Sequence, residues 1–310
     1  MNFPSEQNSL KQNLLEENLK FMQIAFNFAK KHNGMTTSNP SVGCVIVKNN
    51  QIISCASTAI SGRPHAESLA LSKNLDFTDA ILFTTLEPCS HVGKTPACVS
   101  HIIKSGIKQV FISVKDSDYR VNGLGIKMLE EAGIAVHCGL LAEEVFEFYK
   151  PYLTAKVRKK PFVTGKIACS LDGKISTFSG NSKWITSEIQ RNFTNFIRHK
   201  YNGILVGGNT YKQDSPNLTC RIEGLTAFSP IKFLLSSSVK SAEGFNVVSG
   251  NLEEILAKMY SEFEINHLLI EGGAGVITEF LKQDLLDEIM LVQSPIFIGK
   301  DGKIALKKPE

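Results

Sequence analysis

Residues 64–114 read PHAESLALSKNLDFTDAILFTTLEPCSHVGKTPACVSHIIKSGIKQVFISV and decide the fold class of the first half of the chain. Pro64 favours a helix through about Lys73, and Pro96 favours a second helix that ends near Gly106. The runs 80–86 and 109–114 are short and apolar, as buried strands are. Strands that alternate with helices indicate an α/β unit.

The segments around this stretch complete the first unit. They predict helices over 14–31 and 125–132, a strand over 135–140, and a hairpin that turns at Asn49-Asn50. Beyond that hairpin we expect a mostly parallel sheet. A helix should end near Lys150-Pro151, before the basic connector KVRKK. We therefore expect a first domain over 1–148, a linker over 149–160 and a second domain over 161–310.

The second half also alternates between strand and helix patterns. Expected strands cover 162–170, 203–206, 231–235, 267–270 and about 288–298. Expected helices cover 187–200, 252–263 and 276–282, the first opened by a Ser cap and an acidic turn. No internal repeat or low-complexity segment is visible in the sequence, so the two halves are different α/β domains.

Composition narrows the class of protein. The 310 residues are 43% hydrophobic and 21% charged, as in globular proteins, and the net charge of +4 fits either phosphate-bearing ligands or no special partner. The N-terminus has no signal-peptide pattern, and no apolar run reaches the ~18 residues that span a bilayer. Seven scattered cysteines do not suggest a disulfide framework. We expect a cytoplasmic protein with no membrane partner.

Three residues of the opening stretch form a candidate metal site. His65, Cys89 and Cys98 supply three zinc ligands and leave a fourth position for water, as in a catalytic centre. Glu67 lies two residues from His65, close enough to move a proton without binding the metal. Eight residues separate the two cysteines, unlike the short Pro-Cys-x-x-Cys of nucleobase deaminases. The alternative is a chance His-Ala-Glu beside two unrelated buried thiols.

The loop TLEPCSHVGKTPAC and the upstream segment SNPSVGCVIVKNN resemble the deaminase domain of bifunctional riboflavin-biosynthesis enzymes, which join a diaminohydroxyphosphoribosylaminopyrimidine deaminase to a 5-amino-6-(5-phosphoribosylamino)uracil reductase. The resemblance implies a cytidine-deaminase-like fold and places Asn39 beside the substrate, although Asn39-Pro40 is also a turn dipeptide. His91 and Lys94 are further metal ligands, phosphate contacts, or loop residues at the substrate mouth.

Glycine-rich segments and four ordered motifs mark the second half. Glycines at 207–208 and 272–275 suit either a phosphate at a helix N-terminus or ordinary turns. The segments ACSLDGK (168–174), SKWIT (182–186), DSPNLTCR (214–221) and IEGG (270–273) resemble the reductase motifs of the same enzymes. The resemblance covers roughly residues 15–300 and implies a dihydrofolate-reductase-like α/β domain.

That resemblance also implies two groups of binding residues. The expected NADPH contacts are Ala168, Trp184, Thr210, Asp214, Gly272, Gly273 and Gly275. The expected contacts to the phosphorylated pyrimidine are Ser182, Arg198, Leu218, Arg221 and Glu271. Arginine suits phosphate because its guanidinium forks onto two oxygens, but a surface salt bridge is the plain alternative. Trp184, the only tryptophan, is alternatively a core residue.

The resemblance further implies zinc and NADPH as cofactors, and a homodimer or larger assembly. Three features depart from the family. Ala56-Ser57-Thr58 replaces a Gly-x-His, Asp116-Ser117-Asp118-Tyr119 replaces an Asp-Pro-Asn-Pro, and the chain stops early enough that we expect one or two terminal strands of the reductase sheet to be missing.

Two other functions compete with this hypothesis. A polynucleotide deaminase would act on a flipped base, but it has no use for a reductase domain, and the only basic run is KVRKK. We therefore expect no nucleic-acid partner. A non-catalytic zinc scaffold would be marked by loss of Glu67, which is present.

Overall fold

The computed structural model describes residues 6–93, 95–177, 185 and 187–304, with side chains from residue 12 onward. The chain divides into two compact units, residues 1–157 and 158–310. The helix expected to end at Lys150-Pro151 instead continues to Arg158, so most of the expected linker is helical. Proline inside a helix costs ~3 kcal/mol, but Tyr149, Leu153 and Ala155 are buried on both sides of it and hold the helix in place.

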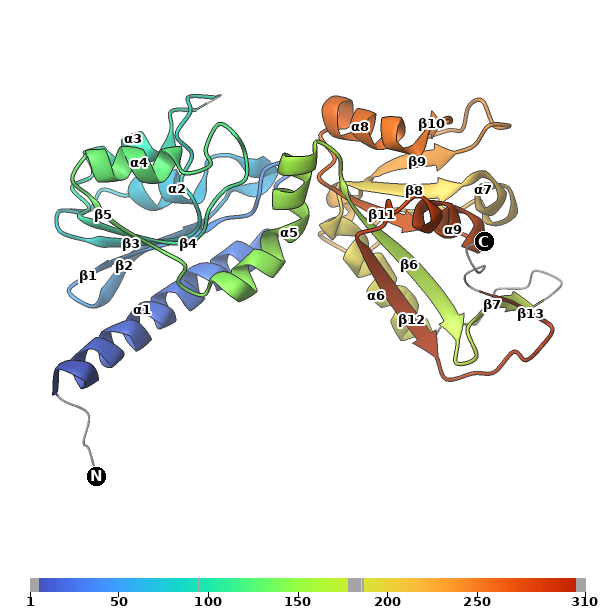
Figure 1. Ribbon diagram of the computed structural model, residues 1–310, viewed down its shortest axis with the longest axis horizontal. Coiled ribbons are helices and arrows are strands. Elements are labelled where there is room, and N and C mark those ends of the chain that lie inside the picture. Colours follow the sequence, from blue (N-terminus) through green and yellow to red (C-terminus); the bar gives the residue numbers. More distant parts are fainter. Residues whose placement is uncertain (1–5, 94, 178–184, 186, 305–310) are drawn as a thin grey trace. The chain divides into compact units, whose positions relative to one another are not determined.

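The first unit is a five-stranded sheet with helices on both faces (Figure 1). The strand order is β2-β1-β3-β4-β5, with β1 antiparallel to β2 and β3, and with β3, β4 and β5 parallel. Figure 1 shows α2, α3 and α4 on one face and α1 and α5 on the other. The elements are α1 (Glu6–Lys31), β1 (Gly43–Lys48), β2 (Gln51–Ser57), α2 (Ala66–Leu71), β3 (Ile81–Leu86), α3 (Cys98–Lys104), β4 (Gln109–Val114), α4 (Leu124–Glu131), β5 (Ala135–Cys138) and α5 (Ala142–Arg158).

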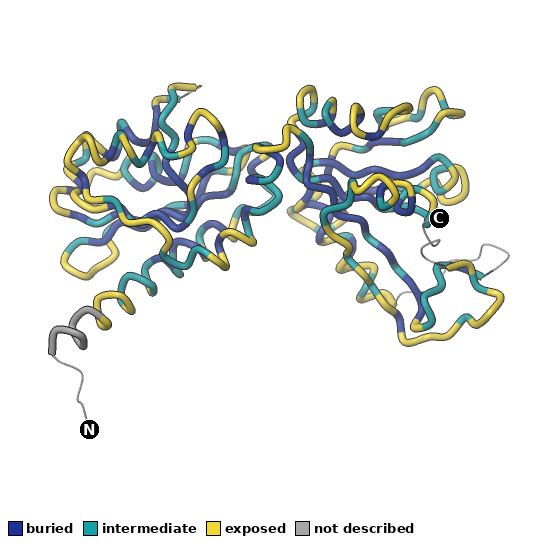
Figure 2. Tube along the Cα trace, viewed as in Figure 1, coloured by how far each residue is buried: buried dark blue, intermediate teal, exposed yellow. Residues whose placement is uncertain are grey.

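Local sequence explains the two tightest features of this unit. Asn49 and Asn50 have φ of 51° and 60°, the left-handed pair that an Asn-rich hairpin turn needs. Gly43 lets α1 approach the sheet, since a Cβ there would lie 1.8 Å from the carbonyl oxygen of Ala25. The resulting core consists of two apolar clusters, and the central strands β1 and β3 are almost entirely buried (Figure 2).

The second unit is built on a six-stranded sheet in which every neighbouring pair is parallel. The strand order is β10-β9-β8-β11-β6-β12. The elements are β6 (Phe162–Ser170), β7 (Lys174–Thr177), α6 (Glu188–Ile197), β8 (Gly203–Gly207), α7 (Gly208–Asp214), β9 (Ile231–Leu235), β10 (Asn246–Val248), α8 (Leu252–Phe263), β11 (His267–Glu271), α9 (Ala274–Lys282), β12 (Glu288–Ser294) and β13 (Gly302–Ile304).

The strand order creates one switch point in this sheet. After β8 the chain runs outward to β9 and β10, whereas after β11 it runs in the opposite direction to β12. Ligands of open α/β sheets bind in the crevice beyond the carboxyl ends of such strands. The segments that follow β8 and β11 are the two glycine-rich segments singled out above.

Most expected elements of this unit are present, and the differences have local causes. The strand expected to reach Ile298 ends at Ser294, because Pro295 cannot donate a ladder hydrogen bond. The helix expected to reach Lys200 ends at Ile197 and continues as a 3₁₀ turn. Its expected Ser cap is confirmed, since Ser187 and Gln190 form a reciprocal capping box. β7 and β13, which pair with each other, and β10 were not expected from the sequence.

Candidate active sites

The first candidate site lies where two helices begin in the first unit. His65 caps the N-terminus of α2, and Cys98 is the first residue of α3. His65 Nδ1 lies 3.3 Å from Cys98 Sγ and 3.5 Å from Cys89 Sγ. The three ligand atoms all lie within 4.8 Å of one another. The structure therefore brings together the three residues expected to bind metal.

This donor set fits zinc. Tetrahedral bonds of about 2.0–2.3 Å separate neighbouring ligand atoms by roughly 3.5 Å, close to the separations from His65 Nδ1 to the two sulfurs. The amide and thiol of Cys98 donate to Cys89 and lower the pKa of Cys89 to about 4, whereas that same interaction and burial raise the pKa of Cys98. Three protein ligands leave a coordination position open, as catalytic zinc requires.

Glu67 lies against this cluster without being part of it. Its Oε2 is 3.7 Å from Cys98 Sγ, and the residue is 3% exposed. Burial raises the pKa of the carboxyl group, and the nearby His65 opposes that rise. A carboxyl group with a raised pKa can both accept and return a proton near neutral pH.

Glu87 has a role that the sequence motif did not indicate. Its buried carboxylate accepts hydrogen bonds from the backbone amides of Asp116, Gly123, Gly125 and Ile126, at 3.0–3.3 Å. Glu87 therefore ties the segment before α4 to the strand end that carries Cys89. The signal in the sequence was an acidic residue at the end of an otherwise apolar strand.

The remaining deaminase residues surround the zinc cluster on loops. Asn39 donates to the carbonyl oxygen of Gly62 at 3.3 Å, which holds the segment just before His65. Arg63 donates to Thr95 Oγ1 at 2.8 Å and so contacts the zinc loop. His91 Nδ1 is buried and has no hydrogen-bond partner among the described residues, while Lys94 lies outside them.

The segment that departs from Asp-Pro-Asn-Pro forms a buried acidic pair. Asp116 accepts from Tyr152 and from the amide of Asp118, and burial raises its pKa to about 6. Asp118 is held by the Arg120 guanidinium at 2.6 and 2.9 Å, which lowers its pKa to about 2. Ser90 donates to the carbonyl oxygen of Arg120, so this segment contacts the zinc loop directly.

The second candidate site is a cavity of about 380 Å³ at the switch point of the parallel sheet. Eight of the expected residues line it: Ala168, Arg198, Thr210, Asp214, Leu218, Glu271, Gly272 and Gly273. They come from β6, from the 3₁₀ turn that follows α6, from the segments after β8, and from the end of β11 and the residues after it. Trp184 and Ser182 lie outside the described residues.

A second cavity of about 510 Å³ shares Thr210, Gln213 and Gly273 with the first. Gly275, another expected contact, lines it, as do glycines 207, 208 and 250 and serines 236–238 and 249. Thr210 Oγ1 accepts from the amide of Gly273 at 3.0 Å and joins the two glycine-rich segments. Glycine-rich backbone beside the N-terminus of α9 fits the phosphates of a dinucleotide such as NADPH.

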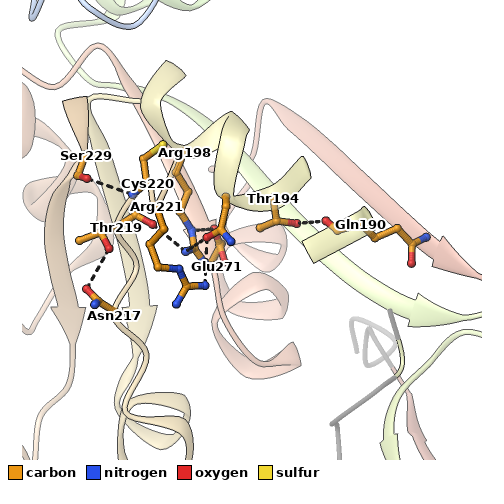
Figure 3. Close-up of polar contacts among 10 residues, drawn as sticks. Gln190, Thr194, Arg198, Asn217, Thr219, Cys220, Arg221, Ser229 and Glu271 are labelled. Atoms are coloured by element: carbon orange, nitrogen blue, oxygen red, sulfur yellow. Dashed lines mark hydrogen bonds and ion pairs between the residues drawn. The ribbon is translucent and has the colours of Figure 1, made fainter. Parts of the chain in front are cut away.

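Arg198 and Glu271 form the polar centre of the first cavity (Figure 3). The guanidinium donates two parallel hydrogen bonds to the carboxylate, at 2.7 and 2.8 Å. Its remaining amino group donates to Asn195 and to the carbonyl oxygen of Thr219. The arginine fork expected to hold a phosphate is thus occupied by Glu271. Arg221 is exposed, does not line the cavity, and donates to Asn195 at 3.1 Å.

Lys166 is a cavity residue that sequence reasoning missed. It lies on β6 and lines the first cavity close to the Arg198–Glu271 pair, and burial lowers its pKa. No ion pair to Lys166 is present within the described part of the chain. The sequence feature that could have identified it is a single lysine inside the otherwise apolar strand FVTGKIACS. Gln213 and Ser236 were also missed, and both line the second cavity.

A three-ligand zinc centre with a buried acid, and a separate nucleotide-sized pair of cavities, define a zinc-dependent deaminase fused to a reductase. Residues 15–114 match the cytidine and deoxycytidylate deaminase zinc-binding region, and residues 161–310 match the RibD C-terminal domain. The chain is 35% identical to the riboflavin biosynthesis protein RibD of Aquifex aeolicus and 37% identical to that of Bacillus amyloliquefaciens, with 90% of this chain and 87% and 85% of theirs covered.

Comparison with solved structures finds proteins of the same kind. The model matches the diaminohydroxyphosphoribosylaminopyrimidine deaminase/5-amino-6-(5-phosphoribosylamino)uracil reductase of Thermotoga maritima with a TM-score of 0.84 and 34% identity, over 94% of this chain and 90% of that one. It matches Acinetobacter baumannii RibD with a TM-score of 0.88 and 28% identity, over 94% and 91%. The chain belongs to the RibD family of riboflavin biosynthesis proteins. It is a bifunctional deaminase and reductase whose cofactors are zinc and NADPH.

Proposed function

We propose that this enzyme carries out two successive steps on one phosphorylated pyrimidine. The first unit hydrolyses the amino group of 2,5-diamino-6-ribosylamino-4(3H)-pyrimidinone 5′-phosphate, so that water enters the ring and ammonia leaves. The second unit reduces the ribosyl group to a ribityl chain. The observation that supports the deamination step most directly is the His65–Cys89–Cys98 cluster with Glu67 buried against it.

In the deaminase step, bound zinc supplies a Lewis acid that makes a water molecule nucleophilic near neutral pH. Glu67 takes the proton of that water and returns it to the ring nitrogen and to the departing ammonia. Asn39, which bonds to Gly62 from the loop between α1 and β1, orients the substrate. Arg63 bears no ion pair among the described residues and contacts the zinc loop, so it is the cation we assign to the substrate phosphate at this site.

In the reductase step, bound NADPH would supply a hydride for reduction of the sugar at C1′. Residues of the second cavity, with Thr210, Gly273 and Gly275 among them, hold the cofactor phosphates. Glu271, oriented by Arg198, and Lys166 lie in the first cavity where the sugar must bind. A lysine whose pKa is lowered by burial is a good proton donor for ring opening.

We also infer that the enzyme is a cytoplasmic homodimer or larger assembly. All seven cysteines are free thiols, as expected in a reducing compartment. None of the described helices has the length and apolarity to cross a membrane. Several large apolar side chains of the second unit are exposed, including Ile189 and Phe193 on α6 and Leu291 on β12. Exposed apolar residues grouped on neighbouring elements favour association, and sedimentation of the purified chain tests it.

The test of the proposed function is a mass analysis of products. The diaminopyrimidine phosphate is incubated with the purified chain, with and without NADPH. Without NADPH we expect a mass gain of about one unit, since NH is replaced by O, together with released ammonia. With NADPH we expect a further gain of about two units from hydride and proton. Unchanged substrate, combined with ammonia release from a tRNA or a free nucleobase, would contradict the proposal.

A further inference from the structure

The two cysteine ligands are supported in different ways. Cys89 Sγ accepts the backbone amide of Cys98 at 3.3 Å, a contact that side-chain substitution leaves in place. Besides its contacts with His65 and Glu67, Cys98 Sγ has the hydroxyl of Ser68 as a side-chain neighbour at 3.8 Å. Ser68 follows Glu67 on α2, and its hydroxyl also lies 3.1 Å from Nδ1 of His101 on α3.

These contacts form a chain from His101 through Ser68 to Cys98. A zinc-bound cysteine is a thiolate and can only accept a hydrogen bond. The single hydroxyl proton of Ser68 then points to Cys98, which leaves its oxygen free to accept from His101 Nδ1–H. Only this direction satisfies all three groups when the metal is bound. Neither Ser68 nor His101 is itself a member of the ligand cluster.

We propose that Ser68 and His101 are positioning residues that orient the Cys98 thiolate toward zinc and thereby set the strength of metal binding. Outer-shell hydrogen bonds of this kind fix the direction of a ligand and moderate the charge that it donates to the metal. Both residues lie on the α2 and α3 turns that carry the ligands, so the contact also joins the two helices at the metal centre.

The experiment measures zinc affinity by competition with a chromogenic chelator, on the full-length chain, for wild type, four single variants and one double variant. Ser68→Ala should bind zinc ~10–100-fold more weakly, the usual cost of removing an outer-shell partner. Ser68→Thr keeps the hydroxyl and should restore most of the affinity. Ser72→Ala is the matched control, because Ser72 lies at the end of the same helix and, within the described part of the chain, its hydroxyl bonds only to the carbonyl oxygen of Leu69. It should bind zinc as wild type does.

His101→Leu tests the outer half of the chain. Alone it should weaken zinc binding less than Ser68→Ala, and combined with Ser68→Ala it should add nothing, since it acts through the hydroxyl. Cobalt substitution gives a second readout, because the sulfur-to-cobalt charge-transfer band should shift in Ser68→Ala and stay in place in Ser72→Ala. NADPH oxidation by the same samples reports that the rest of the chain is intact.

Wild-type zinc affinity and an unshifted cobalt spectrum in Ser68→Ala would overturn the proposal. So would equal losses in Ser68→Ala and Ser72→Ala, since the effect would then belong to the helix as a whole. Fully additive losses in the double variant would show that His101 does not act through Ser68. None of these readouts depends on which pyrimidine the enzyme deaminates, so they can fail while the proposed function stands.

Discussion

The two sites of this chain are built in opposite ways. The deaminase centre takes its ligands and its acid from residues 65–98, at the start of two short helices and the loop between β3 and α3. The reductase cavity draws on residues from 166 to 303, brought together by the order of six parallel strands. A site of the first kind depends on local structure, whereas one of the second kind depends on the topology of a whole domain.

The buried acidic side chains of the two sites also differ in their electrostatic surroundings. Glu67 is buried and forms no ion pair among the described residues, and burial raises the pKa of its carboxyl group. Glu271 is also largely buried, but a bidentate arginine holds it. The first acid is therefore arranged to exchange protons, whereas the second accepts two charge-assisted hydrogen bonds from Arg198.

The largest expected effect is loss of the metal ligand at Cys89. Cys89→Ser should lose most of the zinc and all measurable deamination, because a hydroxyl is a far poorer zinc ligand than a thiolate at neutral pH. NADPH oxidation should persist when the deaminated intermediate is supplied, since the reductase cavity contains none of these ligands. Zinc content by atomic absorption and the two activities are the measurements. Full zinc occupancy in the variant would remove Cys89 from the ligand set.

Glu67→Gln comes next. It should keep zinc, because Glu67 is not a ligand, and should lower deamination by at least ~10²-fold, the usual size of a general acid–base contribution. Glutamine preserves the shape of the side chain in its buried site, so the fold should be unaffected. Initial rates of ammonia release, with NADPH oxidation on the deaminated intermediate as the internal control, measure the effect. Near-normal deamination would mean that the proton passes through another group.

Most of the fold could be predicted from the sequence, and so could the grouping of His65, Cys89 and Cys98 with Glu67 beside them. The ligands could be predicted because His65, Cys89 and Cys98 lie beside helix starts that proline marks. Strands such as β6 and β9 were predicted with their observed ends, since buried parallel strands are short, apolar and bounded by turn residues.

The rest depended on contacts between distant segments. Nothing local shows that Arg198 pairs with Glu271, which is 73 residues away. The same is true of Glu87, whose partners follow it by 29–39 residues. Pro151 misled the prediction because burial of its neighbours outweighs its local cost. Lys166 was overlooked because apolar patterning identifies strands but gives no role to a charge inside one.

The two arginines provide the third prediction and test how the reductase site is divided. Arg221→Ala should leave stability unchanged, since Arg221 is exposed, and should lower kcat/KM for NADPH oxidation by about 10–100-fold if it contacts the phosphate, from about 1.5–3 kcal/mol for a charge-assisted bond. Arg198→Ala should cost about 3–5 kcal/mol of folding stability, because it leaves a buried carboxylate unpaired. Deamination should survive in both. Thermal unfolding and steady-state kinetics separate the two outcomes, and equal behaviour of the variants would show that both arginines have one role.

The smallest expected effect concerns Asp116 and the pH dependence of stability. Burial raises its pKa to about 6 in the folded chain, above its ordinary value of 3.8. Protonated Asp116 is therefore favoured by folding, and this stability is present below about pH 4 and lost as the pH rises through 6. Asp116→Asn stays neutral, so its free energy of unfolding should exceed that of wild type increasingly between pH 4 and 7, by at most about 3 kcal/mol.

Asp118→Asn is the control of opposite sign. Its carboxylate has a pKa lowered to about 2 by Arg120, so that variant should be the less stable one at neutral pH and should approach wild type as the pH falls from 4 toward 2. Urea unfolding of the first unit, followed at a series of pH values, gives the free energy of unfolding against pH for both variants. Parallel curves for Asp116→Asn and wild type would show that the pKa of Asp116 is the same in the folded and the unfolded chain.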